Sequence, residues 1–208
     1  MLHIETVEPN TFSILEQLLK IPALSGFYLV GGTALSLTYG HRLSEDLDLF
    51  SSAKFEKEKV IQDLKKKFKT KFIVEEKPPR FGIFCYIDNV KVDIVRHSHP
   101  QIRTAVTMDG IRMFSKEDII AMKVQAILGR GKKKVFWDIA ELLDHYTVAD
   151  FIKFHKEKYS TQNLLISVPQ AMLYFADAEE SEDPISLKNQ TWEKVKKRIS
   201  DKVRKYLK

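Results

Sequence analysis

Three aspartates carry the densest chemistry in this sequence. Asp46 and Asp48 are separated by one residue within a segment, 46–50, that alternates charged and apolar side chains as a half-buried strand does. Alternate residues of a strand face the same side, so both carboxylates would share one face of a sheet. Asp93 interrupts a second apolar strand, 90–95. Clustered carboxylates repel one another unless a cation offsets them, and Mg²⁺ or Mn²⁺ suits such hard oxygen ligands.

We therefore expect Asp46, Asp48 and Asp93 to bind a divalent metal that serves phosphoryl transfer. An isolated Asp-x-Asp is also common in turns and on exposed strand faces. The metal interpretation depends on the residues around it.

A pair of glycines, Gly31 and Gly32, separates a short apolar strand at 26–30 from a short helix at 33–39. Backbone N–H groups at the start of a helix bind anions, and a glycine turn lets a phosphate approach them closely. A Gly-Gly pair is also frequent in plain tight turns. Followed closely by the aspartates, however, it predicts a phosphate site beside a metal site.

The stretch from Gly31 to Phe50 resembles the signature of the nucleotidyltransferase-fold AbiEii/AbiGii toxin family, one of the DNA-polymerase-β-like nucleotidyltransferases. The matching residues are Gly-Gly-Thr-Ala-Leu, Gly-His-Arg and Ser-x-Asp-x-Asp-Leu-Phe. Segments 123–131 and 134–142 resemble the family's helical lysine, its Arg-Gly and its Lys/Arg-Asp-aromatic-aromatic-Asp motif. Val135 stands where many relatives have an acidic residue, which leaves Asp138 as the carboxylate of that motif.

The resemblance implies transfer of a nucleotide from an NTP to an acceptor, and it assigns a role to each matching residue. Asp46 and Asp48 would bind Mg²⁺, and Asp93 would be the third metal ligand and activate the incoming hydroxyl. Lys123 would neutralise phosphate charge, and Asp138 would position that lysine or contact the nucleotide. The expected nucleotide-binding residues are Gly31, Gly32, Thr33, Arg42 and Ser44.

The resemblance also implies partners. Some relatives act on tRNA 3′ ends, so an RNA acceptor is expected, and an antitoxin protein encoded nearby is a further expected partner. Two alternatives stay open: a nucleic-acid-binding module of the same fold that has lost the chemistry, and a nucleotidyltransferase acting on a small molecule. Retention of all three aspartates argues against the first, because clustered carboxylates are costly without a compensating charge.

The charge distribution agrees with an anionic partner. The 208 residues include 34 Lys and Arg against 28 Asp and Glu, for a net charge of +6. Basic residues cluster at 65–71, at 130–134 and in the tail 194–208, where Asp201 is the sole acidic residue. Phosphate contacts are mainly electrostatic, which suits RNA. Each cluster taken alone is equally typical of a solvated surface.

The pattern of elements predicts an α+β protein with a nucleotidyltransferase-like mixed sheet and flanking helices, followed by a C-terminal helical domain. We expect the α/β domain to span 1–112 and the helical domain 113–208. The expected strands are 26–30, 46–50, 72–74, 81–87 and 90–95. The expected helices follow residue 10 and cover 33–39, 56–68, 115–128, 133–145, 147–159, 161–175 (kinked at Pro169) and the basic tail after Thr191.

The remaining features exclude several classes of protein. One cysteine, Cys85, closes no internal disulfide and builds no cysteine-based zinc site, which suits a reducing cytoplasm. No run of 18 apolar residues exists, and the first residues lack the basic and apolar segments of a signal peptide. We expect a cytoplasmic protein with no membrane partner. His97 and His99 are expected in a surface loop, and Trp137 in the core.

Overall fold

The computed structural model describes residues 1–74 and 81–208. Within these residues, seven strands form one mixed sheet in the order β3-β4-β5-β2-β1-β7-β6. The strands are β1 (Tyr28–Val30), β2 (Leu47–Ser51), β3 (Phe72–Val74), β4 (Gly82–Ile87), β5 (Val90–Arg96), β6 (Val106–Met108) and β7 (Ile111–Met113). The helices are α1 (Pro9–Leu19), α2 (Gly31–Tyr39), α3 (Lys57–Phe68), α4 (Lys116–Leu128), α5 (Lys133–Leu142), α6 (Val148–Lys158), α7 (Val168–Leu173) and α8 (Trp192–Leu207).

The centre of the sheet brings β2 and β5 together as a parallel pair, with β1 antiparallel on the other side of β2. β4 and β5 form a hairpin whose turn residues, Asp88 and Asn89, both have positive φ, at 50° and 66°. Two such residues are typical of the type I′ turn, whose twist matches that of the flanking strands. Burial alternates along β2, with Leu47, Leu49 and Ser51 buried. One face of this part of the sheet therefore packs into the core while the other carries the aspartates.

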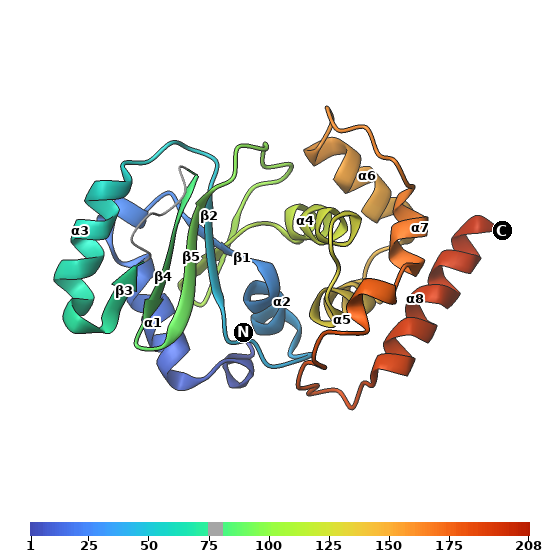
Figure 1. Cartoon of the computed structure of the whole chain (residues 1–208), viewed down its shortest axis with the longest axis horizontal. Helices are drawn as coiled ribbons and strands as arrows, with labels where there is room; N and C mark the ends of the chain where they lie inside the picture. Colours follow the sequence, from blue (N-terminus) through green and yellow to red (C-terminus); the bar gives the residue numbers. More distant parts are fainter. Residues whose placement is uncertain (75–80) are drawn as a thin grey trace.

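Helices cover the two faces differently (Figure 1). α1 and α3 lie against one face, where Val60 and Leu64 of α3 are buried. On the opposite side α2 lies between the sheet and the later helices, and α4 to α8 pack around one another away from the strands. Phe136 and Trp137 are buried among these helices, so Trp137 belongs to the core as expected. The expected boundary between residues 112 and 113 falls inside β7.

Two regions differ from the sequence-based expectation. The helix predicted for 161–175 is wrong, because helix α7 spans only Val168–Leu173. Pro169 lies in its first turn, where a missing N–H breaks no helical bond, so it starts a helix instead of kinking one. The hairpin of β6 and β7 was not predicted. Its turn residues are Asp109 and Gly110, both with positive φ, a dipeptide that favours such turns.

In the described part of the chain, no helix is long and apolar enough to cross a membrane. Cys85 is buried in β4 and is not in a disulfide.

Candidate active site

Asp48 and Asp93 lie side by side on the open face of the sheet. They are direct partners in the register of the parallel strands β2 and β5. Burial, together with the neighbouring charge of Asp93, raises the pKa of Asp48 to about 6, while Lys123 and Lys91 oppose the shift. Lys91 donates to Oδ2 of Asp93 at 3.0 Å. Oδ1 of Asp93 is buried and has no hydrogen-bond partner among the described residues.

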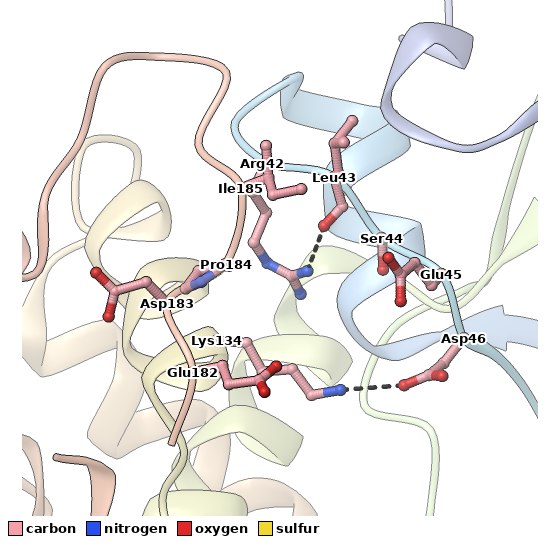
Figure 2. A pocket seen from close by; sticks show the side chains of 10 residues that line it. All are labelled: Arg42, Leu43, Ser44, Glu45, Asp46, Lys134, Glu182, Asp183, Pro184 and Ile185. Atoms are coloured by element: carbon pink, nitrogen blue, oxygen red, sulfur yellow. Dashed lines mark hydrogen bonds and ion pairs between the residues drawn. The ribbon is translucent and has the colours of Figure 1, made fainter. Parts of the chain in front are cut away.

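Asp46 lies one residue before β2, at the end of the loop that leads into the strand. Its Oδ2 is 3.0 Å from Nζ of Lys134, the second residue of α5, and Figure 2 shows the two side chains pointing toward each other. Lys134 was not among the residues predicted for the site. Its place in the basic cluster 130–134, four residues before Asp138, was the signal that could have found it.

The two glycines form the first turn of α2, not a separate turn before it. Gly31 has φ of 74°, and a Cβ atom there would collide with Oδ2 of Asp48. A Cβ atom on Gly32 would collide with the guanidinium of Arg42. Glycine therefore lets the start of α2, with its free N–H groups and its positive dipole end, lie directly against the carboxylates.

Thr33 and Ser44 hold the loop that carries Asp46. The Thr33 hydroxyl is hydrogen-bonded to Oγ of Ser44 at 2.8 Å and donates to the backbone carbonyl of Asp46. Both side chains are buried. The hydroxyl of Thr33 is thus engaged within the protein, and the contribution of this residue to an anion site would come from its backbone N–H at the helix start.

Asp138 is fully buried at the centre of three charged or titratable groups, His41, Arg42 and Lys123. His41 and Arg42 donate to its Oδ1 at 2.8 and 2.7 Å, and Arg42 also donates to Oδ2 at 3.1 Å. Nζ of Lys123 is 2.7 Å from the same Oδ2. The Arg42 guanidinium and Lys123 hold the pKa of Asp138 well below its usual range despite its burial. Asp138 therefore positions Lys123, whose side chain is 12% exposed.

The donor set fits a divalent cation in part. An unpartnered buried oxygen on Asp93 and the burial-raised pKa of Asp48 are both features that a bound positive charge would relieve. Among the described residues, no group of three or more His, Cys, Asp or Glu side chains is arranged to hold a metal ion. Asp48 and Asp93 are adjacent and could both bind a cation, while the carboxylate of Asp46 forms an ion pair with Lys134.

Two cavities meet at Asp46, and both are also lined by Glu45. The first, about 270 Å³, is also lined by Arg42, Ser44 and Lys134 and is closed by the strap, defined here as residues 182–187. The strap is hydrogen-bonded to the loop before the aspartates, from Leu43 N to the carbonyl of residue 185 at 2.9 Å. The second cavity, about 360 Å³, lies toward the β4–β5 turn.

The three basic clusters occupy different places. Lys133 and Lys134 border the site and pair with Asp183 and Asp46. The cluster at 65–71 lies on and after α3, and the basic tail forms α8, at opposite ends of the molecule in Figure 1. The His97–His99 loop follows β5, and the ring of His99 lies edge-on to that of Tyr159 at the C-terminal end of α6, with the centroids 4.5 Å apart.

Comparison with known proteins identifies the family. Residues 13–206 match the model of the nucleotidyl transferase AbiEii toxin family, a type IV toxin–antitoxin system. This chain belongs to that family. It is therefore a nucleotidyltransferase toxin, as the resemblance of the motifs predicted. An uncharacterized protein of Aquifex aeolicus is 29% identical over 200 residues, covering 93% of this chain and 94% of that protein.

Solved structures confirm the fold. JHP933 of Helicobacter pylori superposes with a TM-score of 0.57 at 19% identity, covering 95% of this chain and 92% of that one. The nucleotidyltransferase toxin MenT4 of Mycobacterium tuberculosis superposes with a TM-score of 0.56 at 12% identity, covering 93% of this chain and 85% of that one. The predicted α+β nucleotidyltransferase fold is thereby confirmed.

Proposed function

We propose that this toxin transfers a nucleotide from an NTP to an RNA acceptor, with Mg²⁺ or Mn²⁺ bound by Asp48, Asp93 and Asp46. The pairing of Asp48 with Asp93 in the register of β2 and β5 carries this proposal. Two adjacent carboxylates beside the positive end of a helix and beside Lys123 suit a metal-bound triphosphate.

The chain's own residues divide the work. The start of α2, with Gly31, Gly32 and Thr33, would bind phosphate oxygens through backbone N–H groups. Lys123, oriented by Asp138, would neutralise charge that develops on the phosphates. The first cavity, lined by Arg42 and Ser44, is the proposed place of the nucleotide. When bound, the divalent metal would supply further positive charge on the phosphates.

The transfer step places Asp93 as the proton acceptor. The acceptor hydroxyl oxygen forms a bond to the α-phosphorus, and the bond from that phosphorus to the pyrophosphate oxygen breaks. The hydroxyl proton passes to the carboxylate of Asp93, whose Oδ1 has no hydrogen-bond partner within residues 1–74 and 81–208. Pyrophosphate leaves with the negative charge that Lys123 and the helix start offset.

Basic helix α8 is the proposed contact for the RNA backbone. Its buried residues include Val195, Ile199 and Val203, and the opposite face is exposed and basic. Because its apolar face is part of the core, deleting the helix would unfold the protein, so charge reversal of Lys197 and Lys202 is the sharper test. We expect weaker RNA binding with a flatter salt dependence and unchanged NTP binding. An antitoxin encoded nearby and a cytoplasmic location are part of the same proposal.

The decisive experiment incubates the purified protein and Mg²⁺ with each labelled NTP in turn and with total bacterial RNA. We expect label on RNA, a loss of about a thousandfold in Asp48→Asn, and a strong reduction in Lys123→Ala. Asp177→Asn, an exposed aspartate outside α8 and outside both cavities, is the matched control and should keep wild-type activity. No transfer by the folded wild-type protein under any NTP would contradict the proposal, as would full activity in Asp48→Asn.

A further inference from the structure

The open face of the sheet continues past the aspartates onto β4 as a surface of aromatic side chains. In the strand register Phe84 is the direct partner of Asp93, which is in turn the partner of Asp48. One step along, Tyr86 is the partner of Lys91. These residues alternate with buried Ile83, Cys85 and Ile87, so they share the face that carries the carboxylates.

Two aromatic rings on or beside this surface, those of Tyr86 and Phe81, are exposed to solvent. Tyr86 is 49% exposed, and Phe81, which lies edge-on to Phe84 at 5.8 Å, is 55% exposed. Exposed aromatic rings on a sheet surface are the usual platform on which unpaired bases stack. Their position in line with Asp93 places such a platform on the side of the carboxylates away from the nucleotide cavity.

The second cavity is built around Tyr86. About 360 Å³ in volume, it is lined by Tyr86 and Lys91, by Asp46, and by Asn10 at the start of α1. Glu8 and Asp88 add carboxylates to its wall. A wall rich in carboxylates repels phosphate but accepts hydrogen bonds from hydroxyl and base N–H groups. Its chemistry therefore suits the sugar and base of a nucleotide, with the phosphate lying outside.

We propose that this cavity holds the unpaired 3′-terminal nucleoside of an RNA acceptor, with its base stacked on Tyr86. The inference rests on the proposed transfer to RNA and adds the place where the acceptor ends. Asp46 lines both cavities, so a nucleotide in the first and a nucleoside in the second would meet at the metal-binding aspartates. Lys91 lines the cavity and donates to Oδ2 of Asp93 at 3.0 Å, so a terminal hydroxyl held there would lie near the proposed proton acceptor.

Charge at the rim also suits a nucleic acid. Lys71 bonds Asp88 at 2.6 Å beside the cavity, and it ends the basic cluster at 65–71. A strand whose last nucleoside lies in the cavity would have its preceding phosphates near this cluster, where the interaction is electrostatic. A small cationic acceptor would use the carboxylates of the wall but would not need the tyrosine ring.

The test uses the full-length protein and a short single-stranded RNA whose 3′-terminal base is the fluorescent adenine analogue 2-aminopurine. Stacking quenches this fluorophore. We expect quenching by the wild type and by Tyr86→Phe, and loss of quenching with about tenfold weaker binding in Tyr86→Ala. Tyr174→Ala, which removes a tyrosine of similar exposure, 53%, on the helical side, should match the wild type.

Kinetics provide the second measurement. In Tyr86→Ala, KM for the RNA acceptor should rise about tenfold while KM for the NTP stays unchanged, and the same RNA with its 3′ end base-paired should be insensitive to the substitution. If the wild type labels RNA but Tyr86→Ala keeps the acceptor KM and the quenching, the inference alone is overturned. If the wild type labels only a small cationic molecule and no RNA, the proposed acceptor and this inference both fail.

Discussion

Two buried ionic clusters sit in this protein, and they differ in how completely their charge is balanced. At the candidate active site, one carboxylate, Asp138, pairs with two cations, Arg42 and Lys123, and with His41. In the other cluster, one carboxylate, Asp118, faces one cation, Lys158, at 2.7 Å, and both side chains are 0% exposed.

In the second cluster, both charged groups have several hydrogen-bond partners besides each other. Asp118 also accepts from the Ser115 hydroxyl at 2.7 Å and from the backbone N–H groups of residues 102 and 103. The ammonium group of Lys158 also donates a hydrogen bond to the carbonyl of Pro100 at 2.8 Å. No charge is left over, so this pair holds the segment before β6 against α4 and α6. Its local role explains its complete burial.

The cluster at the candidate active site, formed by Asp138 with Arg42, Lys123 and His41, has an excess of positive charge and a partly exposed cation, Lys123. Lys123 reaches Asp138 from one side and lowers the pKa of Asp48 from the other. A surplus cation held by a buried carboxylate and pointed at a carboxylate pair is suited to receive phosphate. Balanced burial is typical of a structural pair, whereas the surplus cation of the unbalanced cluster is what the proposed function uses to bind phosphate.

The largest expected effect comes from neutralising the carboxylate at the centre of the unbalanced cluster. Asp138→Asn leaves Arg42 and Lys123 without a counter-charge in the interior, and it should lower the free energy of unfolding by about 3–5 kcal/mol. It should also lower kcat, because Lys123 loses its anchor. Urea denaturation and transfer assays on the folded fraction measure the two effects.

The matched control is Asp144→Asn, which removes an exposed Asp–Arg pair with Arg198 and should cost less than about 1 kcal/mol. A kcat unchanged in Asp138→Asn would show that Lys123 needs no positioning by this carboxylate.

Opening the balanced cluster should cost less and should leave the chemistry alone. Lys158→Met removes the cation but leaves Asp118 with one hydroxyl and two N–H donors, so the expected loss is about 2 kcal/mol of unfolding free energy. Per folded molecule, kcat and both KM values should stay at wild-type levels. A changed kcat in a folded Lys158→Met protein would show that the Asp118–Lys158 pair also affects the reaction and is not purely structural.

How far the sequence predicts this molecule depends on whether the decisive contacts are local. The strand with Asp48 and the helices expected at 33–39, 115–128 and 147–159 follow from neighbouring residues and are confirmed. Adjacency of Asp48 and Asp93 depends on the order of the strands, which no local pattern specifies.

Lys134 and Asp46, which form an ion pair, are 88 positions apart in the sequence. Asp138 and Arg42, which are hydrogen-bonded, are 96 positions apart. Motif resemblance named Asp138 and left open what it contacts. For Pro169, the local pattern misled, because a proline inside an apolar periodic run is equally compatible with a helix that starts there.

The smallest expected effect is a pH dependence of the unfolding free energy that arises beside the balanced cluster of Asp118 and Lys158. His97 lies near it, and burial lowers the pKa of His97 to about 4, with the charges of Lys158 and His99 acting in the same direction and Asp118 against them. The unfolded chain binds this proton near pH 6.5, so between about pH 6.5 and 4 it holds more protons than the folded protein, and stability falls as pH falls. His97→Phe keeps the ring contacts with Phe50 and removes the titration. Urea denaturation at pH 7.5 and at pH 6 should show a larger drop in unfolding free energy for the wild type than for His97→Phe, by less than about 1 kcal/mol, which is below the losses expected above. Equal drops in the two proteins would mean that His97 is protonated without cost in the fold, and that the surroundings of Asp118 and Lys158 are more open to water than their burial indicates.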